Sequence, residues 1–566
     1  MPRMTGSRAF AEMVKGYGVT HVFFVPTILM EALAEMDALG VRKILTHGEK
    51  AAAYMADGYA RASGRHGVCM AQQIGASNLA AGLRDSWMAG SPVVAITGGP
   101  ATPGRYRRAY QEVEDFTQFD AVTKLSLEVD DVARFPDLLR QVFRAATSGA
   151  PGPAHLRLRG SHGQGVEVEG DLEPLAEPQF SHLPAFRPAP EPERVREAVA
   201  RLAKAQRPVI VAGGGIVMSQ AQAELVELAE KLQIPVATSL TAKGAIPDNH
   251  PLSVGVVGIY SRACANQAVS EADLVFFIGN HSGGQITANW RVPARGTPAI
   301  QLDIDSNELG RNYPNGVSLL GDAKVALRMM VDAAQPKPQA SASAWVGRVQ
   351  DLVKAWRAKS EPVLTSEAVP MRPERLCREI TEALPDDGVV VSDTGHAGMW
   401  TGQMIDITRR GQRYIRCEGS LGWGLPGAMG VKCALPDRPV VCFTGDGGLY
   451  YHLPELETAS RHGINLVVVI NNNSSLNQEI PLVQAAYKEK RDSLSGEMWR
   501  FQTKADLGKV AEALGCATFR VEKPGQLKEL LPKAWGMGKP VVIDCISDDQ
   551  ALAPTAWLPG GGARGH

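Results

Sequence analysis

Short, uninterrupted hydrophobic runs recur along the whole chain and alternate with segments of helical periodicity. Runs without polar alternation are typical of strands that are buried on both faces of a parallel sheet. With helices between them, they predict an α/β protein with three doubly wound parallel-sheet domains. The runs are 19–25, 67–71, 92–97, 208–212, 235–238, 274–278, 299–304, 389–392, 439–444, 466–470 and 540–543.

Two segments with several prolines, 173–193 and 333–344, divide these runs into three groups. Proline-rich, extended composition is typical of segments between domains. The division predicts an N-terminal domain over residues 1–180, a central Rossmann-like domain over 190–335 and a C-terminal domain over 360–550.

The composition narrows the possible partners. The 566 residues include 59 Lys and Arg against 60 Asp and Glu, so the net charge of −1 gives no electrostatic reason to expect nucleic acid or an anionic membrane. The longest apolar runs are too short to span a bilayer, the N-terminus lacks the hydrophobic segment of a signal peptide, and the eight cysteines form no C-x-x-C pair. We therefore expect a cytoplasmic protein that acts on small molecules.

Two polar loops follow predicted strands and are separated by the length of one crossover helix, near 453–461, and one strand. The first loop contains Gly445, Asp446, Gly447 and Gly448, and the second is an asparagine run that contains Asn473. Parallel strands place both loops at one sheet edge. A carboxylate, an amide oxygen and a backbone carbonyl near Ser475 would give Mg²⁺ the oxygen ligands it prefers, with a diphosphate supplying more. The glycines allow the backbone to approach phosphates, and a helix beginning near Leu453 would add its dipole.

This pair of loops resembles the signature of thiamine diphosphate-dependent enzymes, and four further stretches strengthen the resemblance. Residues 422–430 resemble the family's M-G-x-G-L-P-x-A-x-G, and 47–61 resemble R-H-E-x-x-A-x-x-M-A-D-G-Y-A-R of the acetohydroxyacid (acetolactate) synthase large subunit and its relatives. Residues 110–112 resemble F-Q-E, and 303–305 resemble the central domain's I-D-I-D.

The resemblance implies a fold, an assembly and a set of roles. The N-terminal domain would bind the pyrimidine of the cofactor, and the C-terminal domain would bind its diphosphate. The domain between them would be the family's central domain. The active site would lie between two subunits of a homodimer or homotetramer. Glu49 would hydrogen-bond the pyrimidine ring as a catalytic residue, Gln111 would act near the thiazolium, and Leu421 would hold the cofactor in its bent form. The metal ligands would be Asp446, Asn473 and Ser475.

Further positions match the family's cofactor contacts. The resemblance assigns diphosphate contacts to Thr394, Gly395 and His396 and aminopyrimidine contacts to the backbone of Gly419 and Leu421. The complete predicted cofactor set is Glu49, Thr394, Gly395, His396, Gly419, Leu421, Gly445, Asp446, Gly447, Gly448, Asn473, Ser475, Leu476 and Asn477.

The departures from the family pattern fall where the substrate pocket would be. Phe24 and Thr27 replace two glycines of V-F-G-x-P-G, and the loop that begins at Gln72 is one residue shorter than its T-S-G-P-G-x-x-N counterpart. After the metal loop come Gln478 and then Leu482, the latter at the position of the tryptophan with which acetohydroxyacid synthases prefer 2-oxobutyrate. We therefore expect a relative with an altered donor or acceptor pocket rather than the biosynthetic enzyme.

The resulting hypothesis is a thiamine diphosphate- and Mg²⁺-dependent carboligase or decarboxylase acting on 2-oxo acids, aldehydes or diketones. The alternatives are hydrolytic cleavage of a C–C bond in a diketone, or a catalytically silent binding homologue. Gly213, Gly214 and Gly215 follow a predicted strand, where acetohydroxyacid synthases bind FAD. FAD, another nucleotide such as ADP, and no ligand all remain open for this position.

Overall fold

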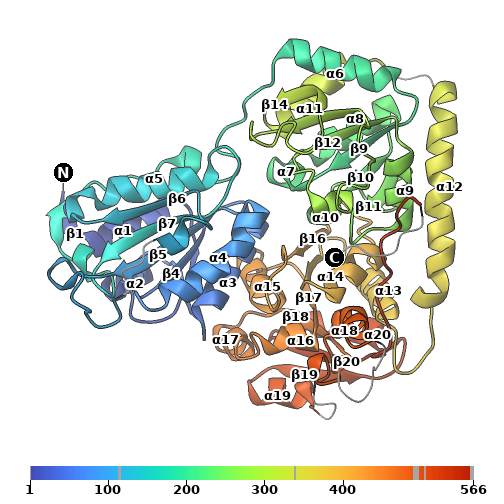
Figure 1. Cartoon of the computed structure of the whole chain (residues 1–566). Coiled ribbons are helices and arrows are strands. Elements are labelled where there is room, and N and C mark those ends of the chain that lie inside the picture. The colour runs from blue at the N-terminus through green and yellow to red at the C-terminus, as the bar shows by residue number, and fades with distance from the viewer. Residues whose placement is uncertain (1, 113–116, 337–338, 489–495, 502–504, 561–566) are drawn as a thin grey trace.

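Three six-stranded parallel sheets, one in each third of the chain, form the framework of the molecule (Figure 1). A computed structural model describes residues 2–112, 117–336, 339–488, 496–501 and 505–560. The prediction of three doubly wound α/β domains is confirmed. No helix in these ranges combines the length and the apolar composition needed to cross a membrane.

The N-terminal sheet has the order β3-β2-β4-β5-β7-β6, and a two-stranded antiparallel pair, β1-β8, lies beside it. Its strands are β1 (Arg3–Thr5), β2 (His21–Phe24), β3 (Arg42–Leu45), β4 (Gly67–Ala71), β5 (Val93–Gly99), β6 (Leu125–Val129), β7 (Ala154–Arg159) and β8 (Glu169–Asp171). Its helices are α1 (Gly6–Gly16), α2 (Met30–Ala38), α3 (Glu49–Ser63), α4 (Ala76–Ala89) and α5 (Phe135–Thr147).

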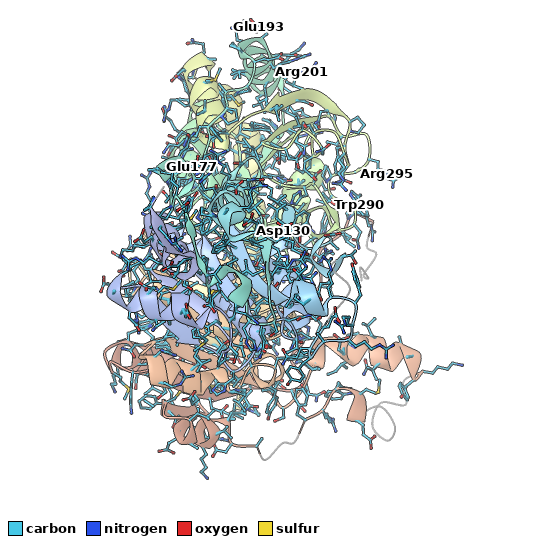
Figure 2. The ribbon with its side chains drawn as sticks, turned by 90° about the vertical axis from the view of Figure 1, so that its left-hand side faces the viewer. Asp130, Glu177, Glu193, Arg201, Trp290 and Arg295 are labelled. Carbon is cyan, nitrogen blue, oxygen red and sulfur yellow. The ribbon has the colours of Figure 1, made fainter. Side chains whose placement is uncertain are left out.

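The central sheet has the order β11-β10-β9-β12-β13-β14. Its strands are β9 (Pro208–Ala212), β10 (Val236–Thr238), β11 (Ser253–Val256), β12 (Leu274–Ile278), β13 (Ala299–Asp303) and β14 (Asn315–Leu320). Its helices are α6 (Pro192–Lys204), α7 (Gly214–Met218), α8 (Gln222–Leu232), α9 (Ala263–Glu271), α10 (Gly284–Thr287) and α11 (Ala323–Ala333). Figure 2, turned by 90°, shows α6 with Glu193 and Arg201 at the far end of this domain.

The long helix α12 (Gln339–Leu364) begins inside the second predicted linker and runs beside the central domain toward the C-terminal domain (Figure 1). Its Trp345 is buried and donates its indole N–H to the carbonyl of Pro208 over 3.0 Å. Helix α12 therefore occupies residues 339–344 of the second predicted linker and is docked on the central domain.

The C-terminal sheet has the order β16-β15-β17-β18-β20-β19. Its strands are β15 (Val389–Ser392), β16 (Arg413–Arg416), β17 (Val440–Gly445), β18 (Val467–Asn472), β19 (Ala517–Val521) and β20 (Val541–Ile546). Its helices are α13 (Pro373–Ala383), α14 (His396–Met404), α15 (Gly424–Ala434), α16 (Asp446–Tyr450), α17 (Glu455–His462), α18 (Ile480–Ala486), α19 (Leu507–Ala513) and α20 (Gln526–Trp535).

The N-terminal and C-terminal domains share one hydrophobic core, although the central domain separates them in the sequence. Helices α3 and α15 cross at glycines. A Cβ on Gly58 would lie 2.0 Å from the carbonyl oxygen of Gly427, and one on Gly430 would lie 1.9 Å from that of Met55. Only glycine allows the two backbones to approach this closely.

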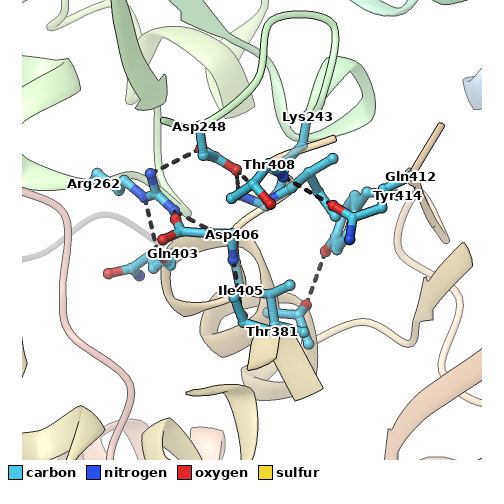
Figure 3. Close-up of polar contacts among 12 residues, drawn as sticks. Lys243, Asp248, Arg262, Thr381, Gln403, Ile405, Asp406, Thr408, Gln412 and Tyr414 are labelled. Carbon is cyan, nitrogen blue, oxygen red and sulfur yellow. Dashed lines mark hydrogen bonds and ion pairs between the residues drawn. The ribbon is translucent and has the colours of Figure 1, made fainter. Parts of the chain in front are cut away.

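A buried ionic network joins the central domain to the C-terminal domain (Figure 3). The carboxylate of Asp248 accepts hydrogen bonds from Lys243 (3.0 Å), Arg262 (2.8 Å) and the backbone N–H of Ile407 (2.8 Å). Arg262 also donates to Asp406 over 2.6 Å. Burial alone would lower the pKa of Arg262, but the two aspartates raise it above its usual value. The charges in this boundary are thus held by one another rather than by water.

Candidate functional site

The two polar loops lie side by side at the carboxyl edge of the C-terminal sheet. β17 and β18 are neighbouring parallel strands, and their register pairs Gly445 with Asn471. Helix α16 begins directly at Asp446, so a short helix that was not expected follows the glycine-rich loop, and the helix expected near Leu453 begins at Glu455. The predicted crossover helix is present as α17.

Asp446 has an unsatisfied carboxylate. The residue is 2% exposed, and within the described residues its Oδ1 has no hydrogen-bond partner. Burial raises the pKa of Asp446 to about 7, while the backbone N–H groups of Gly447 and Ser475 act in the opposite direction. A buried carboxylate without a full set of donors is costly unless a cation completes it.

The neighbouring loop supplies the other oxygen donors. The amide oxygen of Asn473 accepts hydrogen bonds from the backbone N–H (3.2 Å) and the hydroxyl (3.1 Å) of Ser475, and both residues are buried. An orphaned carboxylate oxygen beside amide, hydroxyl and carbonyl oxygens is a donor set that fits Mg²⁺.

Asp393, which sequence reasoning missed, organises the loops around this edge. Its carboxylate accepts hydrogen bonds from the backbone N–H groups of Thr394 (2.7 Å), Gly422 (3.2 Å) and Gly424 (3.1 Å) and from the hydroxyl of Thr444 (3.1 Å). Burial raises its pKa to about 6, although these hydrogen bonds lower it. The signal was its position directly after β15, at the same edge as the predicted residues.

Two of the predicted cofactor segments meet. Nδ1 of His396 lies 2.7 Å from Oδ1 of Asn477, whose amide in turn donates to the carbonyl of Ala551. Gly395 has φ of +64°, and a Cβ there would lie 2.8 Å from Oε1 of Gln478. The loop after β15 and the segment after the metal loop therefore form one continuous wall.

Four of the five predicted glycines divide into two groups. A Cβ on Gly447 would collide with Leu476 at 2.6 Å, and one on Gly448 would lie 2.8 Å from the carboxylate of Asp393, so packing within the domain accounts for both. Gly445 and Gly419 face open space, with nothing described within 4 Å of an added Cβ. These two leave room for a ligand to approach the backbone.

The loop that carries Gly419 and Leu421 is held from the N-terminal domain. Asp85 on α4 accepts hydrogen bonds from the backbone N–H groups of Glu418 (2.9 Å) and Ser420 (3.1 Å). Arg61 on α3 donates to the same carboxylate over 3.0 Å. Asp85 was not predicted as a site residue, because its partners on this loop lie more than 300 positions away in the sequence.

Glu49 is the first residue of α3 and belongs to the corresponding edge of the N-terminal domain. Asn78 donates a hydrogen bond to its Oε2 over 3.2 Å, and a Cβ on Gly75 would lie 2.4 Å from its Oε1. Across the described ranges, no hydrogen bond or ion pair joins Glu49 to the C-terminal domain. One chain thus places Glu49 and Asp446 in different domains without direct contact.

The remaining predicted residues are distributed over both domains. Phe24 ends β2 and is buried, Thr27 has φ of +70° in the loop that follows, and Gln72 follows β4. Gln111 also has a positive φ, and its Oε1 is buried without a partner in the part of the chain that is described. Leu482 lies on α18 with about half of its surface exposed, at 49%.

Comparison with known proteins gives a consistent result for all three domains. The family model "Thiamine pyrophosphate enzyme, N-terminal TPP binding domain" matches residues 4–119. The family's central domain matches 195–330, and its C-terminal TPP binding domain matches 393–545. The chain belongs to the thiamine pyrophosphate enzyme family. The predicted resemblance is thereby confirmed.

Relatives of this thiamine pyrophosphate enzyme match it over most of their length. The chain is 32% identical to the "Probable acetolactate synthase large subunit" of Methanocaldococcus jannaschii, over 99% of this chain and 94% of that protein. It is 30% identical to "Acetolactate synthase" of Arthrospira platensis, over 98% and 96%. It is also 30% identical to "Acetolactate synthase isozyme 1 large subunit" of Escherichia coli, over 84% and 82%.

Proposed function

We propose that this chain is a thiamine diphosphate- and Mg²⁺-dependent carboligase, which releases CO₂ from a 2-oxo acid and joins the remaining acyl fragment to a carbonyl acceptor. The observation that carries the proposal is the unpartnered, buried carboxylate oxygen of Asp446 beside Asn473 and Ser475. The similarity to proteins named acetolactate synthase supports it over nearly the full chain. We expect the enzyme in the cytoplasm.

The C-terminal domain would hold the metal and the diphosphate. Asp446, Asn473 and the carbonyl of Ser475 would bind Mg²⁺, and the wall formed by Gly395, His396 and Asn477 would face the diphosphate, with Thr394 beside it. When bound, thiamine diphosphate supplies the nucleophilic carbon and the electron sink for breaking a C–C bond next to a carbonyl.

The chain's own residues would position the cofactor, exchange a proton with it and stabilise charge on the substrate. The carboxylate of Glu49, fixed by Asn78, would exchange a hydrogen-bonded proton with a ring nitrogen. Gln111 would stabilise negative charge that develops on the substrate oxygen. Leu421, on the loop that Asp85 holds, would support the cofactor from its apolar side.

Phe24, Thr27, Gln72, Gln478 and Leu482 would shape the side of the site on which donor and acceptor enter. They lie at the end of β2, in loops of the N-terminal domain, and in the segment that runs from Gln478 into α18. We propose that they give this chain a pocket different from that of the biosynthetic enzyme.

The proposal includes a homodimer or homotetramer in which Glu49 serves the metal loop of a second copy. The arrangement is supported only by the finding that, within the described residues, no hydrogen bond or ion pair joins Glu49 to the C-terminal domain of its own chain. Mixing a Glu49→Gln variant with an Asp446→Ala variant tests it. Each alone should be inactive, and a mixture that exchanges subunits should regain part of the activity because hybrids contain one intact site. No recovery after verified exchange would contradict the shared site.

The glycine run of the central domain, residues 213–215, gives little reason to expect bound FAD. A Cβ on Gly213 would lie 2.3 Å from the carbonyl oxygen of Gly279, and one on Gly215 would lie 2.7 Å from the Cα of Gly279. These two glycines are required by the contact between the loops after β9 and β12. We propose activity without a flavin, and a yellow purified protein would contradict this part of the proposal.

Two measurements test the reaction itself. Calorimetry with thiamine diphosphate should show binding that depends on Mg²⁺ and is lost in Asp446→Ala. NMR product analysis with pyruvate alone, pyruvate plus an aldehyde, and a diketone should show ligation products. Cleavage of the diketone without any ligation would instead favour the hydrolase. The exposed Glu173 offers a control, since Glu173→Gln should keep full activity whereas Glu49→Gln should lose it.

A further inference from the structure

One carboxylate of the N-terminal domain holds two peptide groups of a loop in the C-terminal domain. Asp85 lies on α4 and is 1% exposed. Its Oδ1 accepts the backbone N–H of Glu418 over 2.9 Å, and its Oδ2 accepts that of Ser420 over 3.1 Å. Each carboxylate oxygen therefore binds one peptide group of the loop between β16 and α15.

The residues next to these two contacts are those at which the loop was predicted to meet the cofactor. Gly419 lies between Glu418 and Ser420, and an added Cβ there would meet nothing within 4 Å. Leu421 directly follows Ser420. Asp85 thus fixes the backbone on both sides of Gly419 and just before Leu421, while the space at Gly419 stays open.

Arg61 on α3 fixes Asp85 in turn, and both helices lie on the side of the N-terminal domain that faces the C-terminal domain (Figure 1). The side chain of Arg61 is 8% exposed. It donates to Oδ1 of Asp85 over 3.0 Å, to the carboxylate of Asp57 over 2.7 and 2.9 Å, and to the carbonyl of Arg416 over 2.6 Å. Burial would lower the pKa of Arg61, but Asp57 and Asp85 raise it above its usual value. A charged guanidinium therefore joins Asp85 to the strand that leads into the loop.

The central domain also contacts this loop, but through a side chain. The hydroxyl of Thr241 donates to the carboxylate of Glu418 over 3.1 Å. That carboxylate can move with the torsions of its own side chain, whereas the hydrogen bonds of Asp85 hold the peptide chain itself. Asp85 is therefore the contact through which a neighbouring domain sets the path of the backbone at Gly419.

We propose that Asp85 is a positioning residue for the pyrimidine end of the cofactor and serves the site on the C-terminal domain of its own chain. The inference rests on the proposed thiamine diphosphate-dependent function. Asp85 acts through the backbone at Gly419 and Leu421 and not by touching the cofactor. Because Glu49 is proposed to serve a second copy, one N-terminal domain then contributes to two sites, to one through Asp85 and to the other through Glu49.

Calorimetry on the full chain with Mg²⁺ tests the positioning role with thiamine diphosphate and with inorganic pyrophosphate, which lacks the pyrimidine. Asp85→Asn keeps one oxygen for Arg61 but replaces the other by an amide N–H₂, which cannot accept a peptide N–H. The variant should weaken the binding of thiamine diphosphate by about 10-fold, the loss expected for a hydrogen bond to a charged group. It should leave pyrophosphate binding unchanged, whereas general damage to the site would weaken both ligands.

Two further variants assign the effect to the contact itself. Asp85→Glu keeps the charge beside Arg61, which protects folding, but its longer side chain displaces the carboxylate from the loop, so it should show the same split between the ligands. Asp37→Asn makes the same chemical change in an exposed pair with Lys43 and should change neither ligand. Thiamine diphosphate binding that is unchanged in both Asp85 variants, or weakened equally with pyrophosphate, would overturn the inference alone. A wild type that does not bind thiamine diphosphate would overturn the proposed function as well.

Mixed oligomers test which site Asp85 serves, at a thiamine diphosphate concentration near the wild-type dissociation constant. Subunit exchange between Asp85→Asn and Glu49→Gln should restore activity, because each hybrid then contains one site without either change. Exchange between Asp85→Asn and Asp446→Ala should not, because each site of the hybrid carries one of the two changes. Recovery with Asp446→Ala but not with Glu49→Gln would show that Asp85 serves the site of the second copy and would overturn the assignment.

Discussion

The indole N–H of Trp423 donates a hydrogen bond to the carboxylate of Asp57 over 2.9 Å, across the boundary between the C-terminal and N-terminal domains. Asp57 is fully buried and also binds Arg61 at 2.7 Å, and the guanidinium of Arg61 lies 4.9 Å from the centre of the Trp423 ring. The boundary between the two domains thus contains a specific polar contact inside their shared core.

We predict that Asp57→Ala destabilises the protein by about 3 kcal/mol, because it leaves the buried Arg61 without its nearest counter-ion and the indole without an acceptor. Urea unfolding followed by tryptophan fluorescence measures the change. Asp137→Ala, which removes the exposed partner of Arg134, should cost at most about 0.5 kcal/mol. Equal losses in the two variants would contradict the importance of the buried contact.

The glycine crossing of α3 and α15 gives a second prediction. Gly58→Ala should destabilise the protein by at least about 2 kcal/mol, because the methyl group would overlap the carbonyl oxygen of Gly427 and force the helices apart. Gly347 on α12 is the matched control, since an added Cβ meets nothing within 4 Å. Gly347→Ala should stabilise the helix by about 0.5 to 1 kcal/mol, so thermal melting should shift in opposite directions.

The ionic network between the central and C-terminal domains gives a third prediction. Asp248→Ala should cost about 3 to 5 kcal/mol, because Lys243 and Arg262 would remain buried without that carboxylate. Limited proteolysis should then cut between the central and C-terminal domains faster than in the wild type. Glu271→Gln, which alters an exposed pair with Arg348, should leave the cleavage rate unchanged.

Buried histidines predict a dependence of stability on pH. His66 is buried with Nε2 3.0 Å from the carbonyl of Phe143, and burial lowers its pKa to about 4. The folded state therefore keeps His66 neutral between pH 6.5 and 4, where the unfolded state is protonated. Its contribution is present above pH 6.5 and is lost as the pH falls, by about 1.4 kcal/mol per pH unit in that range.

A His66→Phe variant should show a correspondingly shallower fall of the unfolding free energy between pH 6.5 and 4. The control is Thr147→Val, which removes another hydrogen bond to the same carbonyl, of 3.3 Å, but no titrating group. It should lose stability by the same amount at every pH. An unchanged slope in His66→Phe would show that His66 does not titrate in this range.

The interior strands could be predicted from the sequence because they are uninterrupted apolar runs, such as that of β18. The strands that were missed carry polar residues. β3 and β6 lie at sheet edges, where one side of the strand needs no partner strand and charged side chains are tolerated. β7 is an inner strand, but it contains His155 and Arg157, both buried, which local hydrophobicity cannot identify.

The residues of the candidate site also fall into those that the sequence predicts and those that it does not. Asp446 and Asn473 were predictable because each directly follows a strand, and neighbouring strand ends meet in space. Asp85 and Asp393 were not predictable, because each acts by binding loops that lie far away in the sequence. Local patterns indicate which atoms gather at a sheet edge, whereas the fold decides which carboxylate holds each loop in place.

The shared core of the N-terminal and C-terminal domains also sets an order of events during synthesis. Asp57 and Trp423 are 366 residues apart, so at about 5 to 20 residues per second the ribosome delivers Trp423 roughly 20 to 70 seconds after Asp57. Throughout that interval the alanine-rich face of α3 cannot pack against α15, because α15 has not yet been synthesised. The N-terminal domain, although it is made first, can therefore complete its core only after the final third of the chain has been synthesised.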